Sequence, residues 1–255
     1  MKVIGIILTV ILVIVVVVIA IFASINVKAM NNCIDTAIAA IREEHQLTEI
    51  PEDEYGMVKL NFAMTFDVDH YRIEDIGNLS VMKLNMGVMQ MATFVLTPDE
   101  KDIPVLSADY MFMLPIRKTY LEIYDLVINN DDTYKSYLEQ FDEIKSRYAA
   151  IQDTDHSEVW YSSLITVGTY KQGNSRNDDA TAEMLAENVR LMLRMADEYP
   201  ALSEEEVESK RQIVVDYSDG LIENGGISTD MFKKSLGAET SKDFFDKVFF
   251  GTASN

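Results

Sequence analysis

Cysteine, histidine and basic side chains are scarce in this sequence of 255 residues. The single cysteine, Cys33, excludes an intramolecular disulfide and any site built from several thiolates. The three histidines, His45, His70 and His156, lie far apart, and none belongs to a helical HExxH-type pair that binds zinc. A metal site is therefore not expected.

Acidic side chains outnumber basic ones in the region after residue 30. Residues 1–30 contain two lysines and no acid, so residues 31–255 carry 20 basic and 42 acidic side chains and a net charge of −22. Such a surface repels phosphates, whereas nucleic acids and anionic lipid headgroups are bound by clusters of Lys and Arg. No nucleic-acid partner is expected, and the region is long enough for one domain with a real core.

A long apolar run opens the chain. Residues 3–23 contain no charged side chain, and a helix of these 21 residues covers roughly 30 Å, the thickness of the hydrocarbon core of a bilayer. A cleaved signal peptide normally has only about 7 to 15 apolar residues, although the small residues near Ala23 leave cleavage open. The sequence predicts a single-pass membrane anchor with its flank in residues 1–30 and one domain in residues 31–255.

The charges beside the apolar run do not decide which side of the membrane the domain occupies. Lys2 precedes the run, and Lys28 and Arg42 follow it. The positive-inside rule requires a clearer asymmetry of Lys and Arg than this. The orientation stays open at the level of sequence.

Strand-length runs rich in Val, Ile, Phe, Tyr and Met occupy the first half of the domain. They predict strands at 57–66, 78–85, 88–97, 104–113 and 118–127. The segments between them, including residues 67–77, have the composition of turns. Short connections cannot hold crossover helices, so neighbouring strands are predicted to be antiparallel.

Helical periodicity flanks this strand region on both sides. Residues 31–48 predict a short amphipathic helix after the anchor. Beyond the strands, one further strand is predicted at 158–170, and helices are predicted at 131–149, 178–198, 203–219, 228–236 and 239–249. Strands first and helices later indicate an α+β layer fold.

Several segments together resemble the ferredoxin-dependent bilin reductases. In the run TFVLTPDEKDIPVLSADYMFM, a strand ends in Pro and a second segment opens like the P-x-x-G-x-D of that family, with Pro104, Ser107 and Asp109 in the three places. The segments EVWYSS, ENVRLMLRMADEYP, KRQIVVDYSDGL and FKKSLGAETSKDFFDKVFFG resemble later parts of the family. The similarity covers most of residues 57–251 in matching order.

The resemblance implies an α/β/α sandwich with a central, mainly antiparallel sheet, holding a linear tetrapyrrole between the sheet and the C-terminal helices. Enzymes of this family use no metal or flavin and reduce a bilin by electron transfers from ferredoxin, each coupled to protonation by an acidic residue on the sheet. Asp109 matches that proton donor. An apolar pocket raises the pKa of a carboxylic acid, which lets it hold a proton near neutral pH.

Other side chains in these segments are expected to contact the ligand: Ser107, Met111, Met113, Arg117, Trp160 and Ser162. Methionines make an adaptable surface for a flat ligand, but they are more often ordinary core. Arg117 could meet a ligand carboxylate or lie in an exposed turn.

The sequence departs from the family pattern in three respects. The partner of the proton donor on the preceding strand falls at Ala92, which has no polar side chain. A family Asp and its basic neighbour fall at Gly226 and Ile227. The domain is acidic where the reductases offer a basic face to ferredoxin, and the candidates for a surviving patch are Arg190, Arg194, Lys210 and Arg211.

Two functions are consistent with these residues. The first is a membrane-tethered bilin reductase with Asp109 as proton donor, reduced ferredoxin as electron donor and a domain that faces the cytoplasm. The second is a non-catalytic domain of the same fold that binds a tetrapyrrole or another apolar ligand, or that serves in interactions at the membrane.

Overall fold

A nine-stranded antiparallel sheet forms the centre of the protein in the computed structural model, which describes residues 2–51, 54–62, 64–226 and 228–253. The strand order is β1-β3-β4-β5-β6-β7-β9-β8, with β2 beside β3. The strands are β1 (Leu47–Glu49), β2 (Met57–Lys59), β3 (Thr65–Ile73), β4 (Gly77–Asn85), β5 (Met89–Pro98), β6 (Val105–Met113), β7 (Ile116–Tyr124), β8 (Gln152–Asp153) and β9 (Ile165–Gly173).

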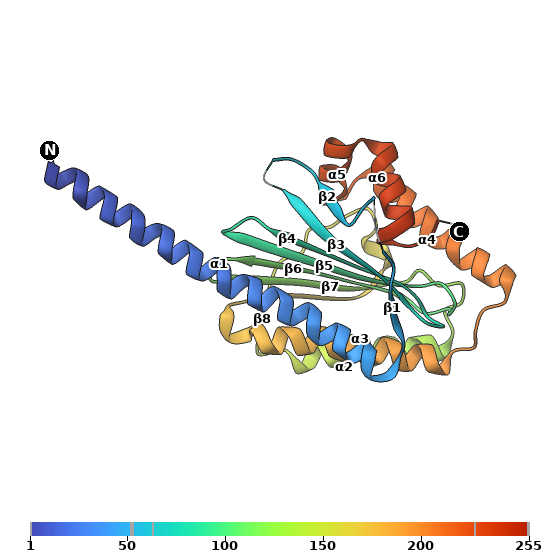
Figure 1. Cartoon of the computed structure of the whole chain (residues 1–255). Helices are drawn as coiled ribbons and strands as arrows, with labels where there is room; N and C mark the ends of the chain where they lie inside the picture. Colours follow the sequence, from blue (N-terminus) through green and yellow to red (C-terminus); the bar gives the residue numbers. More distant parts are fainter. Residues whose placement is uncertain (1, 52–53, 63, 227, 254–255) are drawn as a thin grey trace.

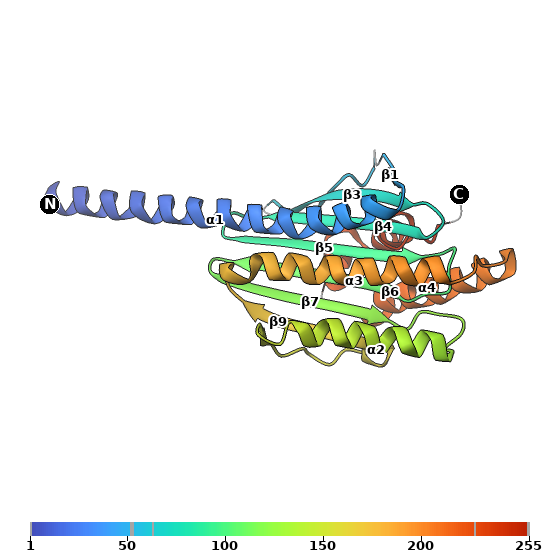
Figure 2. The same cartoon turned by 90° about the horizontal axis from the view of Figure 1, so that it is seen from below.

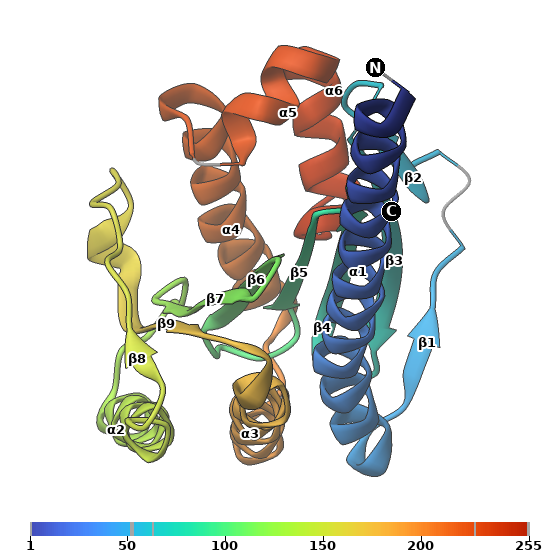
Figure 3. The ribbon, with the colours of Figure 1, turned by 90° about the vertical axis from the view of Figure 1, so that its left-hand side faces the viewer.

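Helices cover both faces of the sheet (Figures 1 and 3). One face packs against α1 (Lys2–Glu44), α2 (Asp132–Arg147) and α3 (Asp178–Glu198), which run along the strands in Figure 2. The other face is covered by α4 (Glu204–Asn224), α5 (Thr229–Leu236), α6 (Ala238–Phe244) and a π-helical turn (Phe245–Phe249). The α+β class and the α/β/α sandwich predicted from the sequence are confirmed.

Alternation along the strands separates two apolar cores. In β6, Leu106, Ala108 and Tyr110 face the layer of α1 and α3, because successive side chains of a strand point to opposite faces. Val105 on the same strand joins the core under α4 and α6. The polar residues that share the face of Val105 are therefore directed toward the C-terminal helices.

Helix α1 joins the apolar run to the core of the domain without interruption. Large side chains from Ile6 to Ile25 are exposed, and burial begins at Asn26. From there to the end of the helix, buried residues recur at three- and four-residue intervals and pack against α3 and β5: Ala29, Met30, Cys33, Ile34, Ala37, Ile38 and Ile41. The amphipathic helix predicted at 31–48 is thus the last part of α1, which ends at Glu44, and the end of the predicted range belongs to β1. The predicted boundary at residue 30 lies inside α1.

The segment 67–77, predicted as a connection, is mostly strand β3. Its charged residues hid the alternation, because Asp67 and Asp69 lie on one face while Phe66 and Val68 are buried on the other. The predicted strand 57–66 is β2 together with the start of β3. Strands β1 and β8 were not predicted, since each has at most three residues.

One helical and one strand prediction also differ from the structure. Helix α4 continues through Gly220 to Asn224, although glycine suggested an end at residue 219. A Cβ at Gly220 would lie 2.4 Å from the ring of Trp160, so glycine here permits close packing. Residues 158–161, predicted as strand, precede a short 3₁₀ turn, and β9 begins only at Ile165.

Candidate functional site

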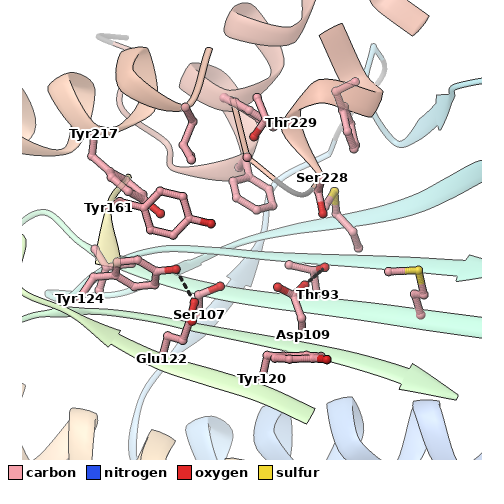
Figure 4. A pocket seen from close by; sticks show the side chains of 18 of the residues that line it. Thr93, Ser107, Asp109, Tyr120, Glu122, Tyr124, Tyr161, Tyr217, Ser228 and Thr229 are labelled. Carbon is pink, nitrogen blue, oxygen red and sulfur yellow. Dashed lines mark hydrogen bonds between the residues drawn. The ribbon is translucent and has the colours of Figure 1, made fainter. Parts of the chain in front are cut away.

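A cavity of about 250 Å³ lies between the sheet and the layer of α4, α5 and α6 (Figure 4). It is far larger than the roughly 30 Å³ of one water molecule and is not a packing defect. The floor is formed by side chains of β4 to β7, one side by the connection between β8 and β9, and the roof by the C-terminal helices. The site is therefore an apolar space with a polar floor.

Asp109 on β6 stands on this floor, paired across the sheet with Thr93 of β5. The Thr93 hydroxyl donates a hydrogen bond of 2.5 Å to Asp109 Oδ1. Removal of the carboxylate from water raises the pKa of Asp109 from 3.8 to about 6, the Thr93 hydrogen bond opposes this rise, and the nearby charge of Glu122 adds to it. About one molecule in ten then holds the proton at pH 7.

Glu122 on β7 is the centre of a second polar group beside Asp109. Tyr124 donates a hydrogen bond to its Oε2, and Tyr170 donates one of 2.9 Å to its Oε1. His156 Nε2 lies 3.2 Å from the same Oε1, and the His156 ring stacks on Tyr170 at 4.2 Å. This network holds the Glu122 carboxylate in place at the wall of the cavity.

Aromatic rings close the roof and the side of the cavity. Tyr217 of α4 packs against Tyr124 at 5.3 Å and against Tyr161 at 5.7 Å. Burial raises the pKa of Tyr161 to about 12, so its hydroxyl stays protonated. Phe232, Phe245, Phe249 and Phe250 complete this wall. Such a wall suits a flat, conjugated ligand, because aromatic faces stack.

Three of the residues predicted for the site line the cavity: Ser107, Asp109 and Met111. Met113 lies at the exposed end of β6, and Ser162, the first residue of a 3₁₀ turn, accepts a 2.9 Å hydrogen bond from the Val159 N–H. Trp160 donates a 2.8 Å hydrogen bond to the Gly225 carbonyl and packs beside the cavity-lining Tyr161. None of these three is part of the lining.

Arg117 lies on the opposite face of the sheet from the cavity. It is 4% exposed, its Nε donates a 2.8 Å hydrogen bond to Asp178, and its guanidinium lies over Phe112. The resulting pair ties β7 to the start of α3, which is a structural role. Alternation explains the placement, because Arg117 and Glu122 are five positions apart on one strand, and positions an odd number apart lie on opposite faces.

The sequence comparison placed the partner of Asp109 at Ala92, one position before the residue that fills this role in the structure. Ala92 pairs with Tyr110 and faces α1, whereas Thr93 supplies the hydroxyl beside Asp109. A shift of one residue in register moves a side chain to the other face of the sheet, and the short sequence match did not fix the register.

The second departure from the family falls on the roof of the cavity. Gly226 lines the cavity and contributes no side chain, and a Cβ there would lie 3.1 Å from Thr229 Oγ1. Ile227 lies outside the described residues. The hydroxyls of Ser228 and Thr229 are the polar groups that this segment brings to the cavity (Figure 4).

The charges of the lining are anionic. Asp109, Glu122 and Asp155 belong to it, and His156 is the one residue in the described lining that can become a cation. No group of three His, Cys, Asp or Glu side chains in the described parts of the chain is placed to hold a metal ion. The site therefore favours a ligand that offers N–H donors.

The basic residues considered for a ferredoxin surface do not form one patch. Lys210 is fully buried and donates a 2.6 Å hydrogen bond to the Ile103 carbonyl. Arg190 pairs with Glu183, and Arg211 pairs with Glu208.

The mainly antiparallel sheet with its two helical layers matches the fold of the bilin reductases. The solved structure of phytochromobilin synthase from tomato in complex with biliverdin is similar, with a TM-score of 0.67. The similarity covers 84% of this chain and 81% of that one at 14% sequence identity. No family model and no curated protein matches the sequence.

Proposed function

We propose that this chain is a membrane-anchored reductase of a linear tetrapyrrole, with Asp109 as its proton donor. The observation that carries the proposal is a carboxyl group of raised pKa, hydrogen-bonded to Thr93, on the floor of an aromatic-walled cavity. The neighbouring fold of phytochromobilin synthase, which was solved with biliverdin, supports the choice of ligand class.

The ligand lies between the sheet and the aromatic roof, with its pyrrole N–H groups directed at the floor. Each two-electron reduction consumes two electrons and two protons. Reduced ferredoxin, or a comparable one-electron carrier, supplies the electrons one at a time. Asp109 gives a proton to the reduced ligand and takes another from solvent, which its pKa of about 6 permits near neutral pH.

The anionic lining orients the ligand by its charge. Asp109 and Glu122 accept hydrogen bonds from pyrrole N–H groups and stabilise a protonated, cationic tetrapyrrole. The described lining offers no Lys or Arg to a propionate. Propionate side chains of the ligand are therefore directed away from the floor and toward solvent.

Helix α1 supplies the membrane anchor. It is long and apolar enough to cross a bilayer, and its large side chains are exposed from Ile6 to Ile25. The reductase function requires the domain to face the compartment that holds the electron donor, the cytoplasm.

The test uses the full chain in phosphatidylcholine nanodiscs with biliverdin and a ferredoxin reducing system. We expect a shifted visible spectrum on binding and a second change on reduction. Asp109→Asn should bind biliverdin within about threefold of the wild-type affinity and lose at least about 100-fold in turnover, with a radical intermediate visible by electron paramagnetic resonance.

Asp67→Asn is the matched control. Asp67 is exposed on β3 and is not part of the cavity lining, so this substitution removes the same charge outside the site. It should leave binding and turnover unchanged. A fully active Asp109→Asn protein would contradict the assignment of the proton donor, and an unchanged spectrum after addition of biliverdin would contradict the ligand class.

The second candidate is a non-catalytic tetrapyrrole-binding domain. It is favoured by Gly226, which leaves the roof of the cavity without the acidic side chain that the family resemblance implies. Biliverdin binding without any reduction, by ferredoxin or by a chemical one-electron donor, would support this candidate.

A further inference from the structure

Four connections lie together at one end of the sheet, the end from which α1 leaves the domain. The pairings Met89↔Met113, Lys59↔Thr65 and Arg117↔Gly173 bring the connections β2–β3, β4–β5, β6–β7 and β9–α3 to this end. Figure 1 shows the tip of the β4–β5 hairpin level with the point where α1 separates from the sheet. Figure 3 looks onto the same end.

Large apolar side chains are exposed on three of these connections. Phe62 is 97% exposed, Val88 is 44% exposed, and three residues of the β6–β7 turn are 37–41% exposed. We call this set the docking face: Phe62, Val88, Met113, Leu114 and Ile116. Among the described residues after α1, the other large exposed apolar side chains are Trp160 and Met57. Met57 belongs to β2, at the same end of the sheet.

The charges of the two ends of the sheet are opposite in character. The connections at the α1 end, residues 60–64, 86–88, 114–115 and 174–177, contain no Asp or Glu in a chain of net charge −20. The exposed cations Lys28, Lys59 and Arg176 lie at or beside this end, and the acids nearest to it, Asp178 and Asp179, begin α3 directly after the last connection. The connections at the far end carry Glu74, Asp75, Asp99, Glu100, Asp102, Asp125 and Asp131.

The position of α1 indicates that a bilayer lies against the docking face. The exposed apolar side chains end at Ile25, and the first buried residue of the domain, Asn26, follows directly. A bilayer that holds residues 6–25 therefore meets the domain at the end of the sheet where α1 leaves it and where the hairpin tips lie. Aromatic and apolar side chains with flanking Lys and Arg are the composition of a membrane interface.

We propose that the docking face rests in the interfacial layer of the bilayer that α1 spans, so that the domain contacts the membrane through three connections as well as through its anchor. The proposal depends on the membrane anchoring described above. The uncharged tips enter the headgroup region, the cations reach the phosphates, and the acidic far end points into the aqueous phase.

The cavity is close to this surface. Met91 and Met111 line the cavity and pair with each other one step inward from Met89↔Met113, about 7 Å along the strands. An apolar ligand dissolved in the bilayer thus has a short path to the site.

Depth-dependent fluorescence quenching tests the docking face on the full chain. A bimane label is placed at Leu114→Cys, at Glu74→Cys in the far turn, or at Val15→Cys in the anchor, in nanodiscs of phosphatidylcholine with brominated acyl chains. Cys33 is 0% exposed and provides no competing label site. We expect quenching at residue 114 at least twofold above that at residue 74.

The three label positions separate the two proposals. Quenching at residue 15 but not at residue 114 would overturn the docking face and leave the anchor intact. Absence of quenching at residue 15 would overturn the anchoring itself. Crosslinking between labelled copies at residue 114, without quenching by lipid, would show a second copy on this face and would also overturn the proposal.

A charged variant provides an independent measurement. With the label at Val88→Cys, the pair Phe62→Glu and Leu114→Glu should reduce quenching to the level seen at residue 74, because charges leave the apolar layer. Phe62→Leu with Leu114→Met is the matched control and should keep it. Unchanged quenching in the Glu variant, with an unchanged circular dichroism spectrum, would contradict the proposal.

Discussion

The carboxyl group of Asp109 occupies a site that disfavours its charge. Its folded pKa of about 6 is above the value of a free carboxyl, so the folded protein holds this proton more tightly than the unfolded chain. Stability is therefore lost as the pH rises from about 4 through 6, and the loss is complete above about pH 7. The burial that raises the pKa of Asp109 therefore both makes its proton available for chemistry and destabilises the folded protein at higher pH.

Asp109→Asn should relieve this cost without removing the acceptor of the Thr93 hydroxyl. At pH 7.5 we expect the variant to be more stable than the wild type by about 1–3 kcal/mol, because a pKa shift of about two units is worth at most about 3 kcal/mol. At pH 4 the difference should vanish, since the wild-type carboxyl is then neutral. Thermal unfolding across this pH range, with Asp67→Asn as the control, measures the effect. A difference independent of pH would contradict it.

Residues of the site differ in how far the sequence could predict them. Asp109 was predicted because the short segment around the β5–β6 hairpin resembles the corresponding segment of the bilin reductases. Thr93 and Glu122 were not, because their place depends on strand register and on the partners across the sheet. Once β5 and β6 are aligned through their hairpin, alternation alone places Thr93, and not Ala92, beside Asp109.

Helix α1 belongs at once to the membrane anchor and to the core of the domain. The sequence predicted both parts correctly as helical but gave no sign that they are continuous. The apolar run and the amphipathic segment have different periodicity, and only contact with α3 and β5 shows that one helix serves both. Strand β3 was predicted mostly as a connection. Charged residues on its exposed face hid the alternation with the buried residues of its other face.

Truncation of α1 should have a sharp threshold. A chain that begins at residue 26 keeps all of the buried side chains, whereas one that begins at residue 31 loses Asn26, Ala29 and Met30. We expect the shorter chain to be less stable by about 2–4 kcal/mol, the value of the apolar surface removed. Urea unfolding of the two chains, with a chain beginning at residue 22 as control, measures the difference. Equal stability of all three would contradict the role of this part of α1.

The acidity of the whole molecule bears on the proposed reduction by ferredoxin. The domain after residue 30 carries a net charge of −22, and of the four candidate cations on α3 and α4, Lys210 is buried, Arg190 and Arg211 pair with acids, and Arg194 is exposed. An acidic ferredoxin is repelled, and salt reduces the repulsion as the Debye length falls from roughly 30 Å at 0.01 M to 8 Å at 0.15 M.

The rate of reduction by ferredoxin should therefore rise several-fold between these two ionic strengths. Stopped-flow measurement of bilin reduction at limiting ferredoxin tests this, and a small neutral one-electron donor serves as the control without a salt effect. A rate that falls as salt is added would reveal an attractive basic surface and contradict the expectation.

The unbroken course of α1 has a final consequence for how the protein searches for its partners. In the membrane-anchored protein proposed above, a helix without a hinge keeps the domain at one height above the bilayer and leaves it only rotation about the helix axis and diffusion in the plane of the membrane. Encounters with another membrane-bound protein then depend on surface density and on matching height, and no longer on concentration in a volume. A ligand dissolved in the lipid diffuses in the same plane, so the protein and the ligand meet by diffusion in two dimensions.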